Sequence, residues 1–327
     1  MRSYWMRMSD TDTALELRDA PVPQPGSRQL LVRMQAAALN RGEFLGAHHL
    51  PKPAAWKAIG SEGAGEVVVA GSDVTGFKPG DRVMGRCAGA FSEYALMEAA
   101  EAIRVPPALS PEQAASIPLT FLVAYDMLVL QGRLKRDEWL LINGVSSGVG
   151  VASLQLGKIL GARVIGTSGS DEKLAALKPL GLDVGLCTRK PDFAGAVMEV
   201  TGQHGADLIV NTVGGTVFAE NIRALAFEGR LATVGYVDGV VSASLDLAAL
   251  HAKRLVVFGV SNRLRSNEQR AAAVPRFVAE VMPHFADGRI TPQIDQVMDF
   301  DRLAEAKARM EAGTHVGKII LRMPLAP

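Results

Sequence analysis

The sequence predicts an α/β protein in which a doubly wound parallel sheet is inserted between two parts of a β-rich domain. From Trp139 to Gly259, short apolar strands alternate with helical segments, as in a parallel sheet covered on both faces. Before residue 110 the apolar runs are strand-like and separated by Gly and Pro. The length of 327 residues suits one large domain or two ordinary ones.

The β-rich part is expected to hold strands at Leu30–Ala38 and Gly65–Val69, and another strand after the turn Pro79-Gly80. Ser110-Pro111-Glu112-Gln113 predicts a helix start with serine at the N-cap. Apolar helical spacing then continues through Leu130.

The central part alternates regularly between the two kinds of element. Expected strands are Trp139–Asn143, Arg163–Thr167, Ala206–Thr212, Arg230–Gly235 and Leu255–Gly259. Expected helical segments are Val149–Leu160, Asp171–Leu180 and Phe218–Phe227, followed by Asn267–Phe285, Leu303–Ala312 and a last strand at Val316–Met323. We place the nucleotide-binding domain at 118–262 and the β-rich domain at 1–117 and 263–327.

Composition narrows the possible partners. The net charge of +1 gives no reason to expect a nucleic acid or an anionic membrane. Cys87 and Cys187 lie far apart, which excludes a disulfide scaffold and favours two buried or half-buried free thiols. No apolar run is long enough to span a membrane and the N-terminus lacks a signal-peptide pattern, so we expect a cytoplasmic protein.

The stretch LLINGVSSGVG, residues 140–150, predicts a diphosphate-binding turn between a strand and a helix. Gly144, Gly148 and Gly150 supply most of the conformational freedom and close approach that such a turn needs. The helix start offers N–H groups and its dipole, and the serine hydroxyls can donate to phosphate. The alternative is a Gly/Ser-rich turn without a ligand. The expected phosphate contacts are Ser146, Ser147, Gly148 and Val149.

The end of the next strand, VIGTSGSDEK, bears on the choice of cofactor. NAD enzymes place an acid there for the ribose 2′-hydroxyl, whereas here Ser168 occupies that position. A 2′-phosphate is expected to meet Ser168, Ser170 and Lys173, with Thr188 or Arg189 as further contacts. NADPH is therefore favoured over NADH; the alternative for Lys173 is a solvated helix lysine.

Residues at the ends of the later strands are expected to border the same cofactor, because open α/β sheets bind ligands at their carboxyl edge. These are Val213, Gly235, Tyr236, Phe258 and Val260.

Several motifs together resemble one family. They are Leu39-Asn40 with Glu43 and Gly46, GSEGAGEVVVAG, KPGDRV, the 144–150 loop, ARVIGTSGS, DLIVNTVGG, GRLATVG and HVGKIIL. The chain resembles the medium-chain dehydrogenase/reductase superfamily, and within it the zinc-free quinone oxidoreductase branch. The resemblance implies a Rossmann domain joined to a β-rich GroES-like domain, a cofactor in the cleft and a homodimer.

The residues argue against zinc. Zinc-dependent relatives have a Gly-His-Glu triplet, which here reads Gly60-Ser61-Glu62, and no cysteine lies near Asn40. Serine is a poor zinc ligand, and one carboxylate cannot make a tetrahedral site. The adjacent His48 and His49 cannot both point at one metal. We therefore expect no metal and a structural role for Glu62.

The resemblance also implies three further site residues. Asn40 matches an asparagine near the nicotinamide and is a candidate catalytic and cofactor-binding residue; its alternative is a loop cap. His48 stands where many relatives have a tyrosine and is a candidate proton donor, or else a surface histidine. Lys318 matches a lysine near the cleft, or else is a solvated edge lysine. Val123 replaces a threonine and Glu43 an aspartate.

These residues favour a zinc-independent, NADPH-dependent oxidoreductase. Without a Lewis acid, alcohol oxidation loses its means of stabilising an alkoxide, whereas hydride transfer to a quinone or another α,β-unsaturated carbonyl stays feasible. One alternative is an enoyl-thioester reductase. An alternative of another class is a non-catalytic NADPH-binding sensor or structural protein.

Overall fold

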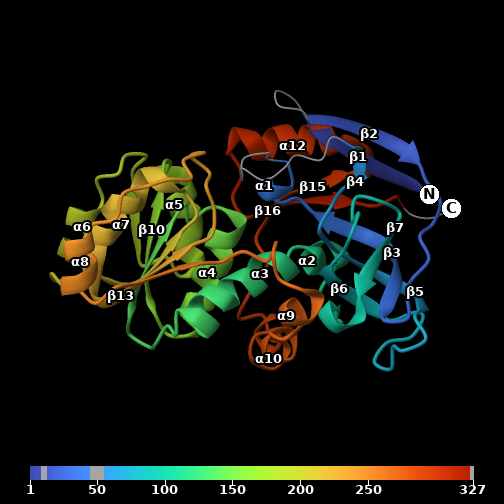
Figure 1. The fold of residues 1–327 in the computed structure, drawn as a ribbon, viewed down its shortest axis with the longest axis horizontal. Coiled ribbons are helices and arrows are strands. Elements are labelled where there is room, and N and C mark those ends of the chain that lie inside the picture. Colours follow the sequence, from blue (N-terminus) through green and yellow to red (C-terminus); the bar gives the residue numbers. More distant parts are fainter. Residues whose placement is uncertain (9–12, 45–54, 325–327) are drawn as a thin grey trace. The chain divides into compact units, whose positions relative to one another are not determined.

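The computed structural model describes residues 1–8, 13–44 and 55–324 (Figure 1). The chain divides into two compact units: unit 1 is Met1–Leu119 with Arg265–Pro327, and unit 2 is Thr120–Leu264. The sequence-based division places both breaks two residues earlier. The architecture is the expected α/β fold with a β-rich part. Among the described residues, no helix combines the length and the apolar character needed to cross a membrane.

Unit 2 contains a six-stranded parallel sheet in the order β11-β10-β9-β12-β13-β14. The strands are β9 Trp139–Asn143, β10 Arg163–Ser168, β11 Val184–Cys187, β12 Ala206–Asn211, β13 Leu225–Thr233 and β14 Val256–Gly259. The chain builds outward from β9 to β11 and then returns to the other side of β9 with β12. The strand order therefore reverses between β9 and β12, where doubly wound sheets bind ligands.

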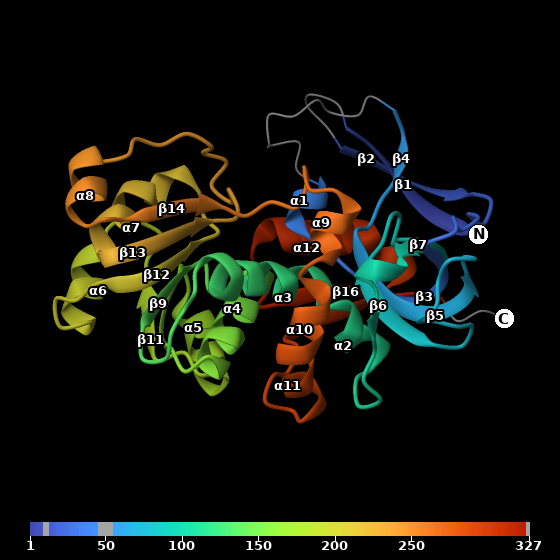
Figure 2. The ribbon, with the colours of Figure 1, turned by 60° about the horizontal axis from the view of Figure 1, so that its bottom comes forward.

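Helices cover both faces of this sheet (Figure 2). They are α4 Gly148–Ile159, α5 Asp171–Leu177, α6 Ala194–Val200, α7 Phe218–Ala224 and α8 Leu247–Ala252, with short 3-10 turns η3 Lys178–Leu180 and η4 Gly215–Val217. Consecutive residues of β9 point to opposite faces: Leu140 lies against Gly157 of α4, and Leu141 belongs to the apolar cluster under α6 and α7. This explains why β9 is apolar at every position before its last residue, Asn143.

Proline divides two segments that the sequence predicted as continuous helices. Between Ser110 and Leu130 the chain forms α2 Pro111–Ala115, α3 Pro118–Tyr125 and the π-helical η2 Asp126–Gln131. Between Asn267 and Phe285 it forms α9 Asn267–Ala271, α10 Val274–Glu280 and α11 Met282–Ala286. Pro118, Pro275 and Pro283 lie in first turns, where a missing N–H costs nothing. The N-cap at Ser110 is confirmed, with both bonds of a capping box.

The prediction of a helix through Phe227 is also wrong. The helix α7 ends at Ala224, and Leu225 already pairs with Ala206 as the first residue of β13. The sheet therefore overrides a helical apolar spacing that continued into the strand.

Unit 1 contains two sheets. The smaller has the order β2-β1-β4, and the larger β15-β16-β3-β5-β6-β8, with β7 also paired to β3. The strands are β1 Arg2–Met8, β2 Thr13–Asp19, β3 Gln29–Ala38, β4 Lys57–Ala58, β5 Glu62–Ala70, β6 Arg82–Arg86, β7 Tyr94–Glu98, β8 Ile103–Arg104, β15 Ile294–Asp299 and β16 Lys318–Arg322. The helices are α1 Arg41–Phe44 and α12 Leu303–Ala312, with 3-10 turns η1 Ala99–Glu101 and η5 Phe300–Arg302.

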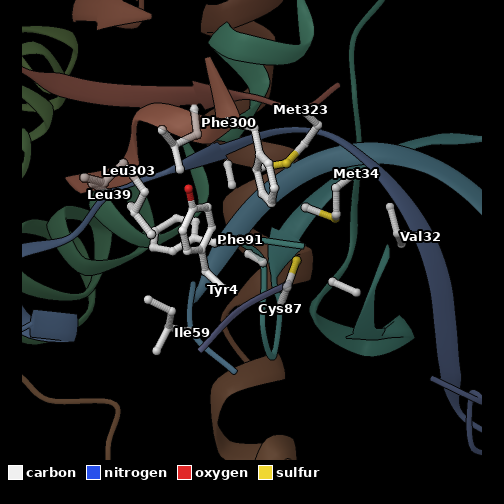
Figure 3. Packing of buried hydrophobic residues seen from close by; sticks show 14 of the residues in the cluster. Tyr4, Val32, Met34, Leu39, Ile59, Cys87, Phe91, Phe300, Leu303 and Met323 are labelled. Atoms are coloured by element: carbon white, nitrogen blue, oxygen red, sulfur yellow. The ribbon is translucent and has the colours of Figure 1, made fainter. Parts of the chain in front are cut away.

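The core of unit 1 packs around aromatic side chains (Figure 3). The rings of Tyr4 and Phe300 lie 5.0 Å apart, and Phe91 is fully buried beside them. Cys87 is part of this core, as expected for a free thiol. Cys187 is exposed, contrary to the expectation, because it lies on β11 at the edge of the other sheet.

Candidate functional site

The loop after β9 is closely packed against the ends of its neighbours. Gly144 has a φ of +70°, and a Cβ there would lie 2.6 Å from Thr212 Oγ1, so glycine is required on both grounds. The Thr212 hydroxyl donates to Asn143 O at 2.7 Å and thereby ties the end of β12 to the end of β9. The turn is fixed at the point where the strand order reverses.

The start of α4 carries unused backbone donors. Ser147 is the N-cap, and its Oγ accepts from Gly150 N at 3.0 Å. The N–H groups of Gly148 and Val149, in the first turn, have no intrahelical acceptor. A Cβ on Gly150 would lie 2.5 Å from Gly144 O, so the loop folds directly onto the helix. This geometry fits a diphosphate group at the helix start.

The end of β10 carries no carboxylate of its own and is flanked by an arginine. Ser168, the last residue of β10, is buried, and Gly169 follows it. The Arg189 side chain lies against Gly169 so closely that a Cβ there would be 2.3 Å from Arg189 Nε. Arg189 is exposed and makes no hydrogen bond or ion pair with another described residue. Its guanidinium is therefore available to an anion beside Ser168.

The other residues predicted to bind the 2′-phosphate near the end of β10 make hydrogen bonds within the protein. Ser170 is the N-cap of α5 and accepts from Lys173 N at 3.3 Å, and Lys173 is half-buried. The Thr188 hydroxyl lies 2.8 Å from Asp192 Oδ1 and accepts from Lys190 N at 3.0 Å, so it closes its own loop. Whether Lys173 and Thr188 contact a cofactor stays a prediction. Arg189, expected only as a further contact alongside Thr188, lies two residues after the end of β11.

The strand ends of unit 2 are aligned by the sheet register. Asn143 pairs with Thr167 and Asn211, Asn211 with Thr233, and Thr233 with Gly259. The residues that follow these strand ends therefore share one edge of the sheet. They include the 144–150 loop, Ser168, Val213, Gly235, Tyr236 and Val260, with Phe258 one step inside β14.

A second polar cluster lies in unit 1, around Lys318. Its ammonium group donates to Leu39 O, Asn40 Oδ1 and Glu62 Oε1, each at 2.8 Å. Lys318 is only 6% exposed, so the alternative of a solvated edge lysine is wrong. All three ammonium hydrogens have acceptors inside unit 1, as a buried charge requires.

Three strand ends create this cluster. Ile320 of β16 pairs with Ala38 of β3, and Ala37 of β3 pairs with Gly63 of β5. The first residue of β16, the residues just after β3 and the first residue of β5 consequently meet at one edge. Lys318, Asn40 and Glu62 occupy those three places.

The side chain of Asn40 is held on every side within the cluster. Its Nδ2 donates to Glu43 Oε1 at 3.0 Å and to Glu62 Oε1 at 2.9 Å, while its Oδ1 accepts from Lys318. Both amide hydrogens are used, so one lone pair of Oδ1 remains for a ligand. Contact of Asn40 or Lys318 with a cofactor stays a prediction, and within unit 1 both are positioned by Glu62.

Glu43 is the second carboxylate of the cluster. Its Oε1 accepts from Asn40 and from the Ser61 hydroxyl, while its Oε2 is buried without a hydrogen-bond partner among the described residues. Burial raises the pKa of Glu43 to about 7, against the opposing hydrogen bonds of Ser61 and Asn40 and the charge of Lys318. The sequence analysis did not predict that Glu43 and Ser61 belong to this cluster. Polar residues next to the buried strand GSEGAGEVVVA are the feature of the sequence that could have indicated it.

The turn before β5 holds Ser61 in place. Gly60 has a φ of +98°, and a Cβ there would lie 2.4 Å from Phe91 N. Its carbonyl accepts from Gly89 N and Ala90 N, and Cys87 N donates to Ser61 O at 2.9 Å. The backbone around Ser61 is thus fixed by several bonds to the next segment.

The donor set of this cluster does not fit zinc. A catalytic zinc takes thiolate, imidazole or carboxylate ligands, whereas the centre of this cluster is an ammonium ion bonded to Glu62 and Asn40. A dication there would meet the charge of Lys318 at close range. Among the residues that the structure describes, no three His, Cys, Asp or Glu side chains gather as a metal site.

One predicted site residue cannot be placed. His48, with its neighbour His49, lies outside the described residues. Its proposed role as a proton donor stays a prediction.

Family models match both units. The model described as alcohol dehydrogenase GroES-like domain matches residues 26–107, and the one described as zinc-binding dehydrogenase matches residues 148–279.

Solved structures and curated proteins give the same family. An NAD-dependent alcohol dehydrogenase is 30% identical, with a TM-score of 0.84 over 99% of this chain and 100% of that chain. Quinone oxidoreductase from Escherichia coli, complexed with NADPH, is 25% identical, with a TM-score of 0.85 over 98% and 99%.

A curated relative is much longer than this chain. A phenolphthiocerol/phthiocerol polyketide synthase from Mycobacterium tuberculosis is 30% identical over 95% of this chain, which spans only 14% of that protein. The matches cover both units of the fold and the loop at the start of α4. The chain belongs to the medium-chain dehydrogenase/reductase family.

Proposed function

We propose that this protein is a zinc-independent, NADPH-dependent oxidoreductase that reduces quinones or other α,β-unsaturated carbonyls. The observation that carries the proposal is the end of β10, where Ser168 replaces the ribose-binding acid and Arg189 lies against Gly169. A bound NADPH supplies the hydride, and the protein orients and desolvates the reactants.

The preference for NADPH rests on charge. A 2′-phosphate near Ser168 would meet the Arg189 guanidinium and no carboxylate on the strand itself. Lys173 lies in the first turn of α5, as do Asp171 and Glu172. An arginine fork binds phosphate with two parallel hydrogen bonds. The NADPH complex of the Escherichia coli relative supports this preference, whereas the relative named NAD-dependent argues for testing it directly.

The choice of acceptor rests on the cluster in unit 1. The centre of the cluster is an ammonium group bonded to Glu62, which does not act as a Lewis acid for an alkoxide. A conjugated carbonyl needs none, because its negative charge spreads over the acceptor as hydride arrives. A quinone, for which the Escherichia coli relative is named, is the first candidate.

Enoyl-thioester reduction is the second candidate, favoured by the likeness to the polyketide synthase. The chemistry is the same hydride addition to a conjugated carbonyl, and only the group beyond the carbonyl differs. A cofactor-binding protein without catalysis is the remaining class.

Two further features belong to the proposal: a homodimer and a cytoplasmic location. β14 is the edge strand of the unit 2 sheet, and its Val256 and Val257 are 52% and 38% exposed. An apolar edge strand with open backbone groups favours pairing with a second copy.

The experiment is an assay of NADPH and NADH oxidation with 1,4-benzoquinone, 9,10-phenanthrenequinone and an enoyl-CoA. We expect turnover with NADPH and a quinone. Turnover with the enoyl-CoA alone would favour the second candidate. NADPH binding without turnover on any acceptor would sink the enzymatic proposal for these substrates and support a sensor.

A further inference from the structure

The cluster in unit 1 holds more negative than positive groups. Lys318 and Glu62 form an ion pair of 2.8 Å with side chains 6% and 0% exposed, so they neutralise each other. Glu43 is a second carboxylate on the same Asn40 amide, without an ammonium of its own. A charge on Glu43 would therefore leave the cluster with a net buried negative charge, which is costly.

The cluster is less buried at Asn40 and Ser61 than at Glu62 and Lys318. Glu62 and Lys318 are buried, whereas Asn40, Glu43 and Ser61 are half-buried. Ser61 bonds to Glu43 and not to the ion pair. The Ser61 hydroxyl is consequently the group that links Glu43 to the less buried side.

We propose that Glu43 stores a proton and passes it through the Ser61 hydroxyl to the oxygen of the acceptor during reduction. This inference rests on the proposed function, because it assigns the proton that the reduced acceptor takes up. In this relay, the Ser61 hydroxyl contacts the acceptor, and Glu43 supplies its proton through Ser61.

The electrostatic surroundings favour a neutral Glu43 that remains able to ionise. Burial raises its pKa to about 7, and the unpartnered Oε2 gives no stabilisation to the anion. The charged groups that face it are Lys318 from β16 and Glu62 from β5, with Arg86 from β6 also within electrostatic reach. No hydrogen bond of the Arg86 side chain is found within the described ranges, and its charge acts on Glu43 as well as on Glu101.

The bonds balance as follows. The two electrons would come with the hydride that bound NADPH would supply, and the acceptor's oxygen would gain negative charge. When Glu43 is protonated, its O–H donates to Ser61 Oγ, and the Ser61 hydroxyl turns to donate to the acceptor. A new O–H bond then forms on the acceptor as the Ser61 O–H bond breaks, and the Glu43 O–H bond breaks as the Ser61 O–H bond re-forms. Glu43 is left as a carboxylate and regains a proton from water.

The stored proton is tested by infrared spectroscopy on the protein without cofactor. The carbonyl stretch of a protonated carboxylic acid should be present at about pH 6 and disappear with a midpoint near 7. It should be absent in Glu43→Gln and unchanged in Glu66→Gln, the control at a half-buried carboxylate on β5. A wild-type spectrum without such a band, or a band that survives Glu43→Gln, would overturn the proposal.

The relay is tested by kinetics with NADPH and the best quinone. We expect Glu43→Gln and Ser61→Ala to lower kcat about 100-fold, with NADPH affinity within about two-fold of wild type. Both should lose the wild-type decline of kcat above pH 7, and Ser61→Thr should restore most activity because it keeps the hydroxyl. A structural role would lower kcat equally at every pH, and that result would contradict the relay.

The two proposals fail in different ways. If the wild type reduces no acceptor, the proposed function and the relay both fall, while the infrared titration still decides whether Glu43 holds a proton. If the wild type is active and Glu43→Gln keeps both its kcat and its pH profile, only the relay falls.

Discussion

The ammonium of Lys318 lies 2.8 Å from the carboxylate of Glu62, and both side chains are buried at one edge of the large sheet in unit 1. The pair holds Asn40 through two hydrogen bonds with its amide, one to each partner. Buried ion pairs gain little relative to apolar residues, but removal of one partner is expensive. The pair therefore determines the shape of the site more than it determines the stability of the fold.

Lys318→Met should destabilise the protein by about 3–5 kcal/mol, because it leaves Glu62 buried and uncompensated. The double variant Lys318→Met/Glu62→Gln should recover part of that loss. Urea unfolding followed by fluorescence measures both. Lys307→Met removes a helical surface pair with Glu311 and should cost less than about 1 kcal/mol. Equal losses of stability in Lys318→Met and Lys307→Met would contradict a buried ion pair between Lys318 and Glu62.

Glu43→Gln should change how stability depends on pH. The pKa of Glu43 is about 7 in the folded protein and 4.5 as the ordinary value. Between these values the unfolded chain releases the proton and the folded chain retains it, so the wild type loses stability as pH rises, by up to about 1.4 kcal/mol per unit.

The matching measurement is the difference in unfolding free energy between Glu43→Gln and wild type across that window. Relative to the wild type, the free energy of unfolding of the variant should increase from pH 5 to pH 7. Above pH 7 the two free energies should change in parallel. A difference that does not vary with pH would show that Glu43 ionises normally.

Gly150→Ala should weaken NADPH binding by at least about ten-fold, because its Cβ would lie 2.5 Å from Gly144 O and 2.6 Å from Val145 O. The loop must shift away from the helix start, and overpacking of this kind costs about 1–3 kcal/mol. Gly195→Ala in α6 is the control, since nothing lies within 4 Å of its Cβ position. Fluorescence titration with NADPH compares the two, and equal affinities would exclude this loop as the diphosphate site.

Arg189→Gln should raise the Kd for NADPH about 10- to 100-fold, the effect of losing a charged hydrogen bond, with little change for NADH. The matched control is Lys190→Gln, which removes the same charge from the next exposed position. Calorimetric titration with both nucleotides separates the two variants. An equal increase of the Kd for NADPH and for NADH would show that Arg189 does not bind the 2′-phosphate.

Val256→Lys should dissociate the proposed dimer, because a lysine on an edge strand blocks strand pairing. Light scattering after size-exclusion chromatography should give half the wild-type mass. Val278→Lys, at another exposed valine on α10, should leave the mass unchanged. A monomeric wild type would remove the basis for this interface.

The alternation of strands and helices and the tight turn at residues 144–150 could be predicted from the sequence, because each depends on neighbours along the chain. Strand β9 is apolar up to Asn143 since both its faces are covered, and Ser147 caps α4 through a residue three positions away. The prolines at 118, 275 and 283 indicate where the helices break, but the continuous apolar spacing favoured longer helices. His48 alone among the predicted site residues lies outside the described ranges.

The sequence by itself determined the family, the two-unit architecture and the strand end at Ser168 that lacks an acid. Only the tertiary structure decided that Lys318 meets residues 278 and 256 positions away, Asn40 and Glu62, in a buried cluster with Glu43. It also decided that Arg189 lies against Gly169. The reason is that local patterns fix dihedral angles and exposed faces, whereas strand pairing between distant segments fixes which side chains share a buried charge.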